Sequence, residues 1–322
     1  MPPAMDDRNS NHPNACPGDR VVAVALGQFD GVHLGHQAVL RRAIEEARGW
    51  GGEAAALTFE PRVDVFFLGA RAPKRISRAA ETVELLRRQG LAAVAAWPFD
   101  EALAALAPAR FLQRLKAEFP ALRCVVGGDD CSFGAGGAGN AATFARHARE
   151  AAPDAPLRGL FVPPVLDAQG RKISSTLVRQ AVAEGDVASA QALLGRPFSV
   201  AGPVVHGRAV GRTRGLPTAN VDVPSDQLLP APGVYAVEVA WAGMPPPPGL
   251  ATAWRGGAFV ANPADCRQAL YKSPVEVHIP GFSGDLYGKT LVARFTRRIR
   301  PFIPFASEQD AIRQIHKDLS LI

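Results

Sequence analysis

The apolar residues of this 322-residue chain change their spacing near residue 194, and this change constrains the fold more than any other feature. Before it, continuous apolar runs alternate with segments whose apolar residues recur at helical spacing. Buried parallel strands joined by helices give this alternation. After Leu194-Gly195-Arg196-Pro197 the apolar runs are short and are separated by glycine and proline, as in antiparallel barrels. The sequence therefore predicts two regions of different architecture.

The first region is typical of a parallel α/β sheet with helices on both faces. Its predicted strands are 21–26, 54–59, 91–97, 122–126 and 160–165. Its predicted helices are 37–48, 81–89, 108–119 and 141–150. Ligands of such sheets bind beyond the carboxyl ends of the strands, so we expect a site at that edge.

The second region is typical of an antiparallel β-barrel followed by a C-terminal helix. Its predicted strands are 198–205, 234–241, 274–279 and 291–299. Ser307 and Asp310 have capping-box spacing at the start of the final helix. The apolar face of this helix carries Ile312, Ile315 and Leu319.

Domain limits follow from the same change of spacing. We expect a disordered extension at 1–19, one domain at 20–194 and a second domain at 195–322. Four prolines at 245–248 predict a stiff hairpin tip or loop inside the second domain, and not a linker.

Composition places the chain among globular proteins, because 47% of its residues are hydrophobic. No apolar run approaches the roughly 20 residues that a membrane helix needs, and the polar segment 1–19 has no apolar signal core. The four cysteines have neither metal-type nor disulfide-type spacing. They are Cys16, Cys124, Cys131 and Cys266. We therefore expect a cytoplasmic protein with no membrane partner, and the sequence leaves self-association open.

A formal net charge of +6 suits either nucleic acid or small anionic substrates. Basic residues are spread along the chain, and only Arg297, Arg298 and Arg300 cluster. Aromatic residues are 7% of the chain and do not alternate with the basic ones. We therefore expect small anionic substrates and no nucleic-acid partner.

The stretch Gly27-Gln28-Phe29-Asp30-Gly31-Val32-His33-Leu34-Gly35-His36 places two imidazoles where the first strand gives way to the first helix. At such a turn the free amides and the positive end of the helix dipole face an anion, and glycines let a ligand approach the backbone. His33 and His36 could also be polar residues at a helix start, or a metal pair with Asp30 as third ligand. The phosphate interpretation has both histidines donate hydrogen bonds to charge developing on phosphorus.

A second polar stretch, Lys172-Ile173-Ser174-Ser175-Thr176-Leu177-Val178-Arg179, places three hydroxyls at a predicted helix start and a guanidinium one turn later. An ordinary N-cap with a surface arginine would give the same letters. Together with the histidine turn, the stretch favours a second group of phosphate contacts.

Two glycine-bearing loops follow the first strand of the second region. Val205-His206-Gly207-Arg208-Ala209-Val210-Gly211-Arg212 comes first, and Gly215-Leu216-Pro217-Thr218-Ala219-Asn220 follows. By itself the second string is also an ordinary turn. Further on, strand alternation at 274–279 puts Glu276 and His278 on one face, where a solvated glutamate is the simplest interpretation.

Taken together, these strings resemble the prokaryotic bifunctional riboflavin kinase and FAD synthetase family, from about residue 21 to the C-terminus. The resemblance implies a Rossmann-like nucleotidyltransferase domain and a riboflavin kinase barrel. It implies phosphorylation of riboflavin by ATP to FMN, and then attack of the FMN phosphate on the α-phosphorus of ATP to give FAD and pyrophosphate. Mg²⁺ would assist both steps.

The resemblance also assigns roles in adenylyl transfer. Gly27, Phe29, Asp30, Gly31 and Gly35 would line the ATP phosphates. His33 and His36 would act at the α-phosphate, and Ser174, Ser175, Thr176 and Arg179 would hold the leaving pyrophosphate. Asp130 would contact the flavin.

In the kinase, the resemblance implies that Gly207 and Gly211 cover the ATP phosphates. Thr218 and Asn220 would bind ATP and Mg²⁺. Glu276 would contact riboflavin and take the proton of its attacking hydroxyl.

Three segments depart from the pattern of that family. Phe59-Glu60-Pro61-Arg62-Val63 replaces Phe-x-Pro-His-Pro, and Cys131-Ser132 stands where an aromatic and a basic residue usually precede Phe-Gly. In 249–261, Thr252 replaces an asparagine and an arginine-proline pair is absent. The alternatives are a divergent member with one activity lost, a nucleotidyltransferase for another phosphorylated small molecule, and a non-catalytic flavin or nucleotide-binding protein.

Overall fold

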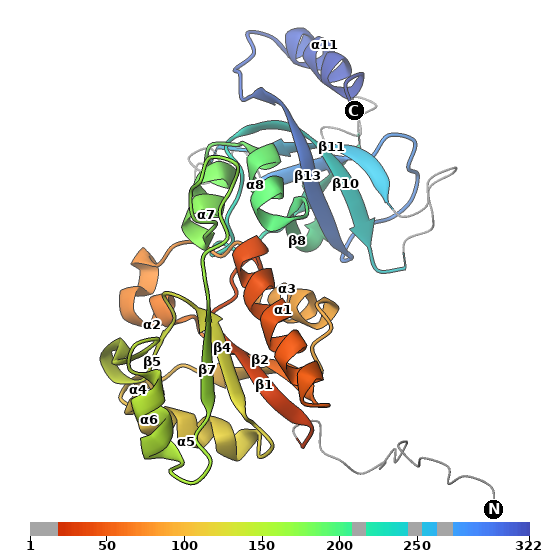
Figure 1. Cartoon of the computed structure of the whole chain (residues 1–322). Helices are drawn as coiled ribbons and strands as arrows, with labels where there is room; N and C mark the ends of the chain where they lie inside the picture. The colour runs from red at the N-terminus through yellow and green to blue at the C-terminus, as the bar shows by residue number, and fades with distance from the viewer. Residues whose placement is uncertain (1–18, 208–216, 244–252, 263–272) are drawn as a thin grey trace, which may run out of the picture. The chain divides into compact units, whose positions relative to one another are not determined.

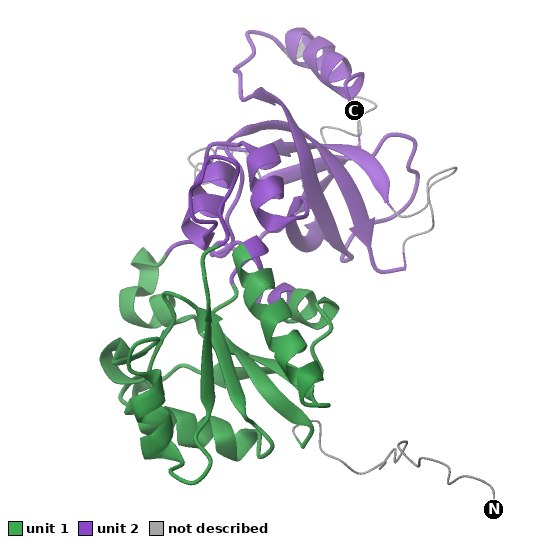
Figure 2. Cartoon of the chain, in the orientation of Figure 1, with its two compact units in different colours: residues 1–29, 35–72, 83–164 green, residues 30–34, 73–82, 165–322 purple. Residues whose placement is uncertain are grey.

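A computed structural model describes residues 19–207, 217–243, 253–262 and 273–322. The chain divides into two compact units that interleave along the sequence (Figure 2). Unit 1 comprises 1–29, 35–72 and 83–164, and unit 2 comprises 30–34, 73–82 and 165–322. Four sequence predictions lie outside the described residues: the disorder of the N-terminal extension, the proline-rich tip, and the roles of Gly211 and Thr252.

Unit 1 is built on a five-stranded parallel sheet of order β3-β2-β1-β4-β7 (Figure 1). The strands are β1 Val21–Leu26, β2 Glu53–Glu60, β3 Ala93–Pro98, β4 Cys124–Gly128 and β7 Arg158–Val162. Every residue of the central strand β1 is buried, which confirms that its apolar run is covered on both faces. The predicted α/β architecture of the first region is therefore confirmed.

Helices cover this sheet on both faces, with α1 on one side and α5 and α6 on the other (Figure 1). The helices of this part are α1 Leu34–Gly49, α2 Val63–Leu68, α3 Ala79–Arg88, α4 Glu101–Ala104, α5 Pro108–Glu118 and α6 Phe144–Ala151. Two short 3₁₀ turns, η1 Gly69–Arg71 and η2 Ala135–Gly137, and the two-residue strands β5 Ser132–Phe133 and β6 Gly139–Asn140 complete it. These short elements have no periodic apolar pattern, so the sequence did not predict them.

Unit 2 contains a closed six-stranded antiparallel barrel of order β10-β11-β12-β9-β8-β13. The strands are β8 Phe198–Val205, β9 Thr218–Val221, β10 Gly233–Trp241, β11 Trp254–Val260, β12 Val275–His278 and β13 Thr290–Pro301. The predicted barrel is confirmed, and β9 and β11 are additions to the four predicted strands.

Two helices that precede the barrel in sequence, α7 Ser175–Ala183 and α8 Val187–Leu194, share its hydrophobic core. Val178, Val182 and Leu193 belong to one buried cluster with Phe198 and Phe295 of the barrel. Residues 165–194 therefore belong to the same compact unit as the barrel, unit 2. The predicted boundary between residues 194 and 195 is a boundary along the sequence and stays a prediction.

Residues 73–82, which lie between helices of the first region in sequence, also belong to unit 2. Arg75 forms a parallel bridge with Gln227, donates its backbone N–H to the carbonyl oxygen of Asp226 and accepts from Leu228. Its guanidinium pairs with the Asp226 carboxylate at 3.1 Å. The 73–82 segment is therefore fixed to the loop that follows β9.

Helix α11, Glu308–Leu319, ends the chain as predicted, with Ser307 as N-cap accepting the backbone N–H of Asp310. A buried ion pair ties it to β13: Arg300 reaches the Asp318 carboxylate with Nε at 2.9 Å and Nη2 at 2.8 Å. Both side chains are largely buried, 15% and 5% exposed. Leu319 and Ile322 come close to Gly257 of β11, so the C-terminus lies against that strand.

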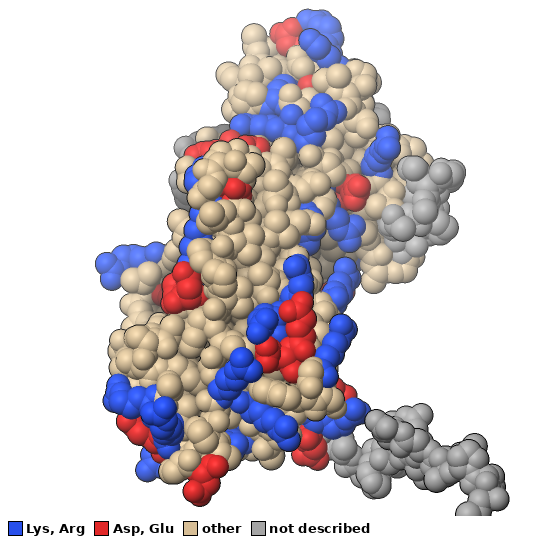
Figure 3. Space-filling model, viewed as in Figure 1, with Lys and Arg blue, Asp and Glu red and all other residues tan. Residues whose placement is uncertain are grey.

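Surface charge is mixed. Figure 3 shows acidic and basic side chains side by side on the face that it draws, as the spread of basic residues along the chain predicts. Among the described residues, no helix is both long enough and apolar enough to span a membrane.

We predict that Asp318→Asn destabilises the barrel by about 3 kcal/mol, because removing one partner of a buried ion pair leaves the Arg300 charge uncompensated. Calorimetric unfolding measures the loss. Glu84→Gln is the matched control: its pair with Arg88 is exposed on both sides, 61% and 66%, so it should cost less than about 1 kcal/mol. Equal effects of the two substitutions would contradict the prediction.

Candidate functional sites

The histidine turn occupies the space between the end of β1 at Leu26 and the start of α1 at Leu34, as predicted. In unit 1 its base is the Phe29 ring, which is buried and contacts the His36 ring edge-on with centroids 5.3 Å apart. A Cβ on Gly27 would lie 3.2 Å from that ring. The glycine therefore allows the Phe29 ring to pack under the backbone and against His36.

The backbone of the turn is strained. Phe29 and Val32 have φ of 53° and 41°, a left-handed conformation that costs a bulky or β-branched residue on the order of 1–3 kcal/mol. Gly31 also has positive φ, and a Cβ there would lie 2.8 Å from Ile76. Such strain persists only where the surroundings over-determine the conformation, which is common at ligand sites.

Arg196 supplies part of that determination in unit 2. Its half-buried guanidinium donates to the carbonyl oxygen of Gly31 at 2.8 Å and to that of Val32 at 3.4 Å. Burial lowers the pKa of Arg196, and the Glu81 carboxylate acts against that shift. His33, the next residue of the turn, is 5% exposed. The carbonyl groups before His33 are thus held by a fixed cation.

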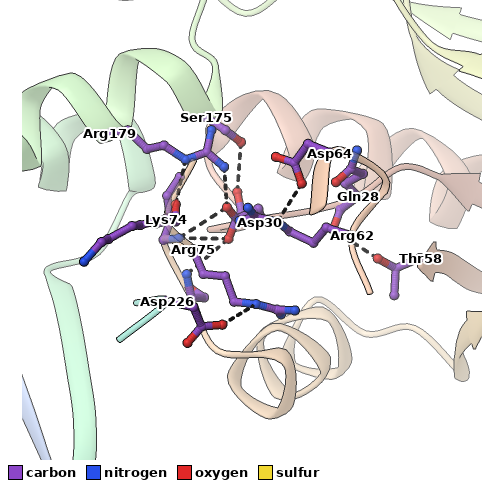
Figure 4. A network of polar contacts seen from close by, with 12 residues as sticks. Gln28, Asp30, Thr58, Arg62, Asp64, Lys74, Arg75, Ser175, Arg179 and Asp226 are labelled. Atoms are coloured by element: carbon purple, nitrogen blue, oxygen red, sulfur yellow. Dashed lines mark hydrogen bonds and ion pairs between the residues drawn. The ribbon is translucent and has the colours of Figure 1, made fainter. Parts of the chain in front are cut away.

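Asp30 joins the turn to the second predicted motif (Figure 4). Its carboxylate, 5% exposed, accepts from the Arg179 guanidinium at 2.6 Å. Its backbone carbonyl oxygen accepts from the Ser175 hydroxyl at 3.0 Å. Ser174 caps α7 by accepting the backbone N–H of Leu177 at 3.3 Å, so the motif begins a helix as predicted. The two motifs, about 145 residues apart in sequence, therefore meet.

Asp130 lies exposed just beyond the carboxyl end of β4, the strand beside β1 in the sheet. The neighbouring Cys131 is half-buried, and its sulfur would lie 2.9 Å from a Cβ on Gly127. Burial, and then the Asp130 carboxylate, raises the pKa of the Cys131 thiol to about 12. Cys131 is one of the residues that depart from the family pattern, and its thiol is therefore uncharged at neutral pH.

Arg62, another departure, is 4% exposed and donates from Nε to the Asp64 carboxylate at 3.0 Å. It lies two residues beyond the carboxyl end of β2, at the N-cap of α2, where its side chain makes no capping hydrogen bond to the helix backbone. A permanent cation thus replaces a titratable histidine of the family pattern at this edge of the sheet.

In unit 2, the predicted kinase residues share one face of the barrel sheet. The antiparallel register pairs Glu276 with Asn220 and His278 with Thr218. Val275 and Val277 point into the core, which confirms the alternation predicted for β12. Side chains directly opposite on paired strands lie about 4.5–5.5 Å apart at Cβ, so the carboxylate, amide and hydroxyl face the same space.

Gly207, at the end of β8, packs directly on this face. A Cβ there would lie 2.2 Å from the Asn220 amide nitrogen, so any residue other than glycine would clash with the Asn220 side chain. The His278 ring contacts the residue before β9, with Nδ1 2.8 Å from the carbonyl oxygen of Pro217. Beside the loop, the His206 and Tyr287 rings stack with centroids 3.8 Å apart.

The structure thus places every predicted site residue except Gly211, which lies outside the described residues. Sequence reasoning missed Arg196 and the amides of Ile76 and Ser77, whose partners are remote in sequence. In the described part of the chain, no group of three or more His, Cys, Asp or Glu side chains is arranged to hold a metal ion. This finding does not support the alternative of a metal site formed by His33, His36 and Asp30.

Comparison with family models matches both regions. A model described as FAD synthetase matches residues 17–177, and one described as riboflavin kinase matches 194–322. Bifunctional riboflavin kinase/FMN adenylyltransferase from Escherichia coli K12 is 36% identical over 295 residues, covering 92% of this chain and 90% of that protein. The chain belongs to this family.

A second curated relative and one solved structure are also similar to this chain over nearly its whole length. The Pseudomonas fluorescens protein is 33% identical over 310 residues, 95% of this chain and 94% of that one. The crystal structure of a macrolide-efflux protein from Streptococcus pneumoniae aligns with a TM-score of 0.79 at 31% identity, covering 95% of this chain and 94% of that chain. Its name refers to efflux, whereas both matching family models describe enzymes of flavin synthesis.

We predict that Cys131 in the folded enzyme reacts at least about 100-fold more slowly with iodoacetamide at pH 8 than in urea-unfolded chain, because a pKa of about 12 keeps the thiol protonated. Peptide mass spectrometry after timed labelling gives both rates. Similar rates in the two states would show that the thiol is neither buried nor raised in pKa.

Proposed function

We propose that the two sites described above carry the two reactions of the family. The chain is a bifunctional enzyme: it phosphorylates riboflavin with ATP to FMN and adenylylates FMN with ATP to FAD and pyrophosphate. The observation that carries the assignment of the first site is the contact of Asp30 with both Arg179 and Ser175, because it joins the histidine turn to the α7 motif.

Adenylyl transfer requires no covalent intermediate with the protein. The FMN phosphate attacks the α-phosphorus, so the protein aligns the two phosphates and neutralises charge in the transition state. His33 and His36 donate hydrogen bonds at the α-phosphate, with the turn residues Gly27, Phe29, Gly31 and Gly35 shaping its backbone approach. Ser174, Ser175, Thr176 and Arg179 hold the departing pyrophosphate, and Asp130 contacts the flavin.

In the kinase, Glu276 is the general base that takes the proton of the ribityl hydroxyl as it attacks the γ-phosphorus. Its register position opposite Asn220 supports this role, because the base and the phosphate-binding residues then face one space. Gly207 supports it too, since any larger residue would displace the Asn220 amide. Gly207 and Gly211 cover the phosphates in this proposal.

Thr218 and Asn220 suit a magnesium ion, because a hydroxyl and an amide oxygen are hard ligands and share one face of β9. Bound with ATP, Mg²⁺ would supply charge neutralisation on the phosphates. The same hydroxyl and amide would orient the nucleotide, and Glu276 would act on the proton.

Two further expectations, the domain limits and the cellular compartment, become part of the proposal. We assign residues 20–194 to adenylyl transfer and 195–322 to the kinase, which the family-model ranges 17–177 and 194–322 support. We assign the enzyme to the cytoplasm, and the free thiols of Cys124 and Cys131 in the described part support a reducing compartment.

We predict that His36→Ala lowers FAD formation from FMN and ATP about 100- to 1,000-fold, the usual cost of one lost donor to transition-state charge. FMN formation from riboflavin should stay within about twofold, which reports that the protein is folded. His316→Ala, which removes an exposed histidine on α11, is the matched control. Near-normal FAD formation by His36→Ala would remove the histidine turn from the reaction.

We predict that Glu276→Gln lowers FMN formation from riboflavin about 100- to 10,000-fold, because the amide keeps the shape of the side chain and removes the base. Chromatography of riboflavin, ATP and Mg²⁺ mixtures measures it. Adenylylation of supplied FMN should be unchanged. Glu238→Gln, at an exposed position of β10, controls for the loss of a carboxylate from the barrel, and retained kinase activity in Glu276→Gln would exclude the base role.

A further inference from the structure

The Asp30 carboxylate is buried and both of its oxygens already accept hydrogen bonds. Oδ1 accepts the backbone N–H of Ile76 at 3.0 Å and that of Ser77 at 3.2 Å. Oδ2 accepts from Arg179 at 2.6 Å, with Ile76 again at 3.2 Å. Figure 4 shows the Arg179 guanidinium pointing toward the Asp30 carboxylate. A buried anion needs such complete compensation, because desolvation would otherwise make it costly.

This arrangement argues against direct contact between Asp30 and a phosphate. Among the residues that the sequence assigned to the phosphates, Asp30 is the only acid, and a carboxylate and a phosphate at close range repel each other. The donors that could offset the repulsion already point at Asp30. Asp30 therefore acts on the residue that it holds, Arg179.

Arg179 is held at two points. Its Nε donates to the carbonyl oxygen of Lys74 at 2.9 Å, while Nη2 donates to Asp30. These contacts fix the plane of the guanidinium and use two of its five N–H donors. The other three donate to none of the residues that the structure describes, and the side chain is 17% exposed. The fork can therefore present its remaining donors to an anion in a single orientation.

We infer that Asp30 is a positioning residue for adenylyl transfer. Its carboxylate orients the Arg179 guanidinium so that the unused N–H groups meet the triphosphate, and Asp30 itself does not touch the nucleotide. The inference rests on the proposed role of Arg179 in holding pyrophosphate. Lys74, Ile76 and Ser77, which fix Arg179 and Asp30 through backbone atoms, belong to the same positioning device.

Asp30→Asn tests this directly, because an amide can replace only one of the two oxygens. With its oxygen on the Ile76 and Ser77 amides, the asparagine NH₂ faces the Arg179 N–H, and two donors repel. The turn keeps its backbone contacts while Arg179 loses its orientation. The affected quantity should be kcat/KM for ATP in adenylylation of FMN.

A double-mutant cycle with Arg179→Gln separates positioning from direct binding. We expect Arg179→Gln to lower kcat/KM for ATP about 100-fold and Asp30→Asn at least about tenfold. The double mutant should be within about threefold of Arg179→Gln, because Asp30 then has nothing left to orient. Effects that multiply in the double mutant would overturn the inference. Phosphorylation of riboflavin by each variant reports folding, and Glu84→Gln, which removes the carboxylate of an exposed ion pair with Arg88, is the matched control.

Arg179→Lys carries the test if Asp30→Asn lowers both activities. Lysine keeps the charge but cannot reach Asp30 and Lys74 as a planar fork. Positioning predicts a loss close to that of Arg179→Gln, and activity within about threefold of wild type would overturn it. These outcomes differ from failure of the proposed function, which would appear as undiminished FAD formation in His36→Ala and in Arg179→Gln.

Discussion

Satisfying one buried carboxylate is the constraint on which much of unit 2 depends. Asp30 is out of water, so its charge must be met by donors from other parts of the chain. Those donors come from the backbone at Ile76 and Ser77 and from Arg179 on α7, two segments that are remote from Asp30 in sequence. The contact also satisfies the hydrogen-bonding groups of each segment, because two buried N–H groups and a guanidinium donate to the same carboxylate.

The strained turn depends on the same neighbourhood. Phe29 and Val32 adopt positive φ, which the turn could not maintain by itself. Arg196 holds the carbonyl groups of Gly31 and Val32, and Ile76 fills the space that a Cβ on Gly31 would need. The histidines thus stand on a backbone whose shape is set before any substrate arrives. Preorganisation of this kind lowers the cost of aligning two phosphates.

Local patterns predicted local structure well. The apolar run of β1, the N-caps Ser174 and Ser307, and the outward face of Glu276 and His278 each follow from spacing within one element. The spacing of residues gave no sign of contacts between segments that are distant in sequence. Arg196 stands between a glycine and a proline like any surface arginine, and nothing periodic marks residues 73–82 for the barrel. Contacts such as Arg75 with Asp226 arise from tertiary packing, which single-sequence spacing does not encode.

The 73–82 segment makes contacts that a separation of the two family regions would break. Along the sequence they follow one another, but the segment has its partners at 224–228, on β8 and on α7. A gene cut after codon 194 would give a first fragment in which Arg75 is separated from Asp226 and Glu81 from Ser199, and a barrel with an uncovered strip along β8. Natural or engineered fission of the two activities would therefore have to redesign this strip, whereas fusion proteins that keep the chain whole would not.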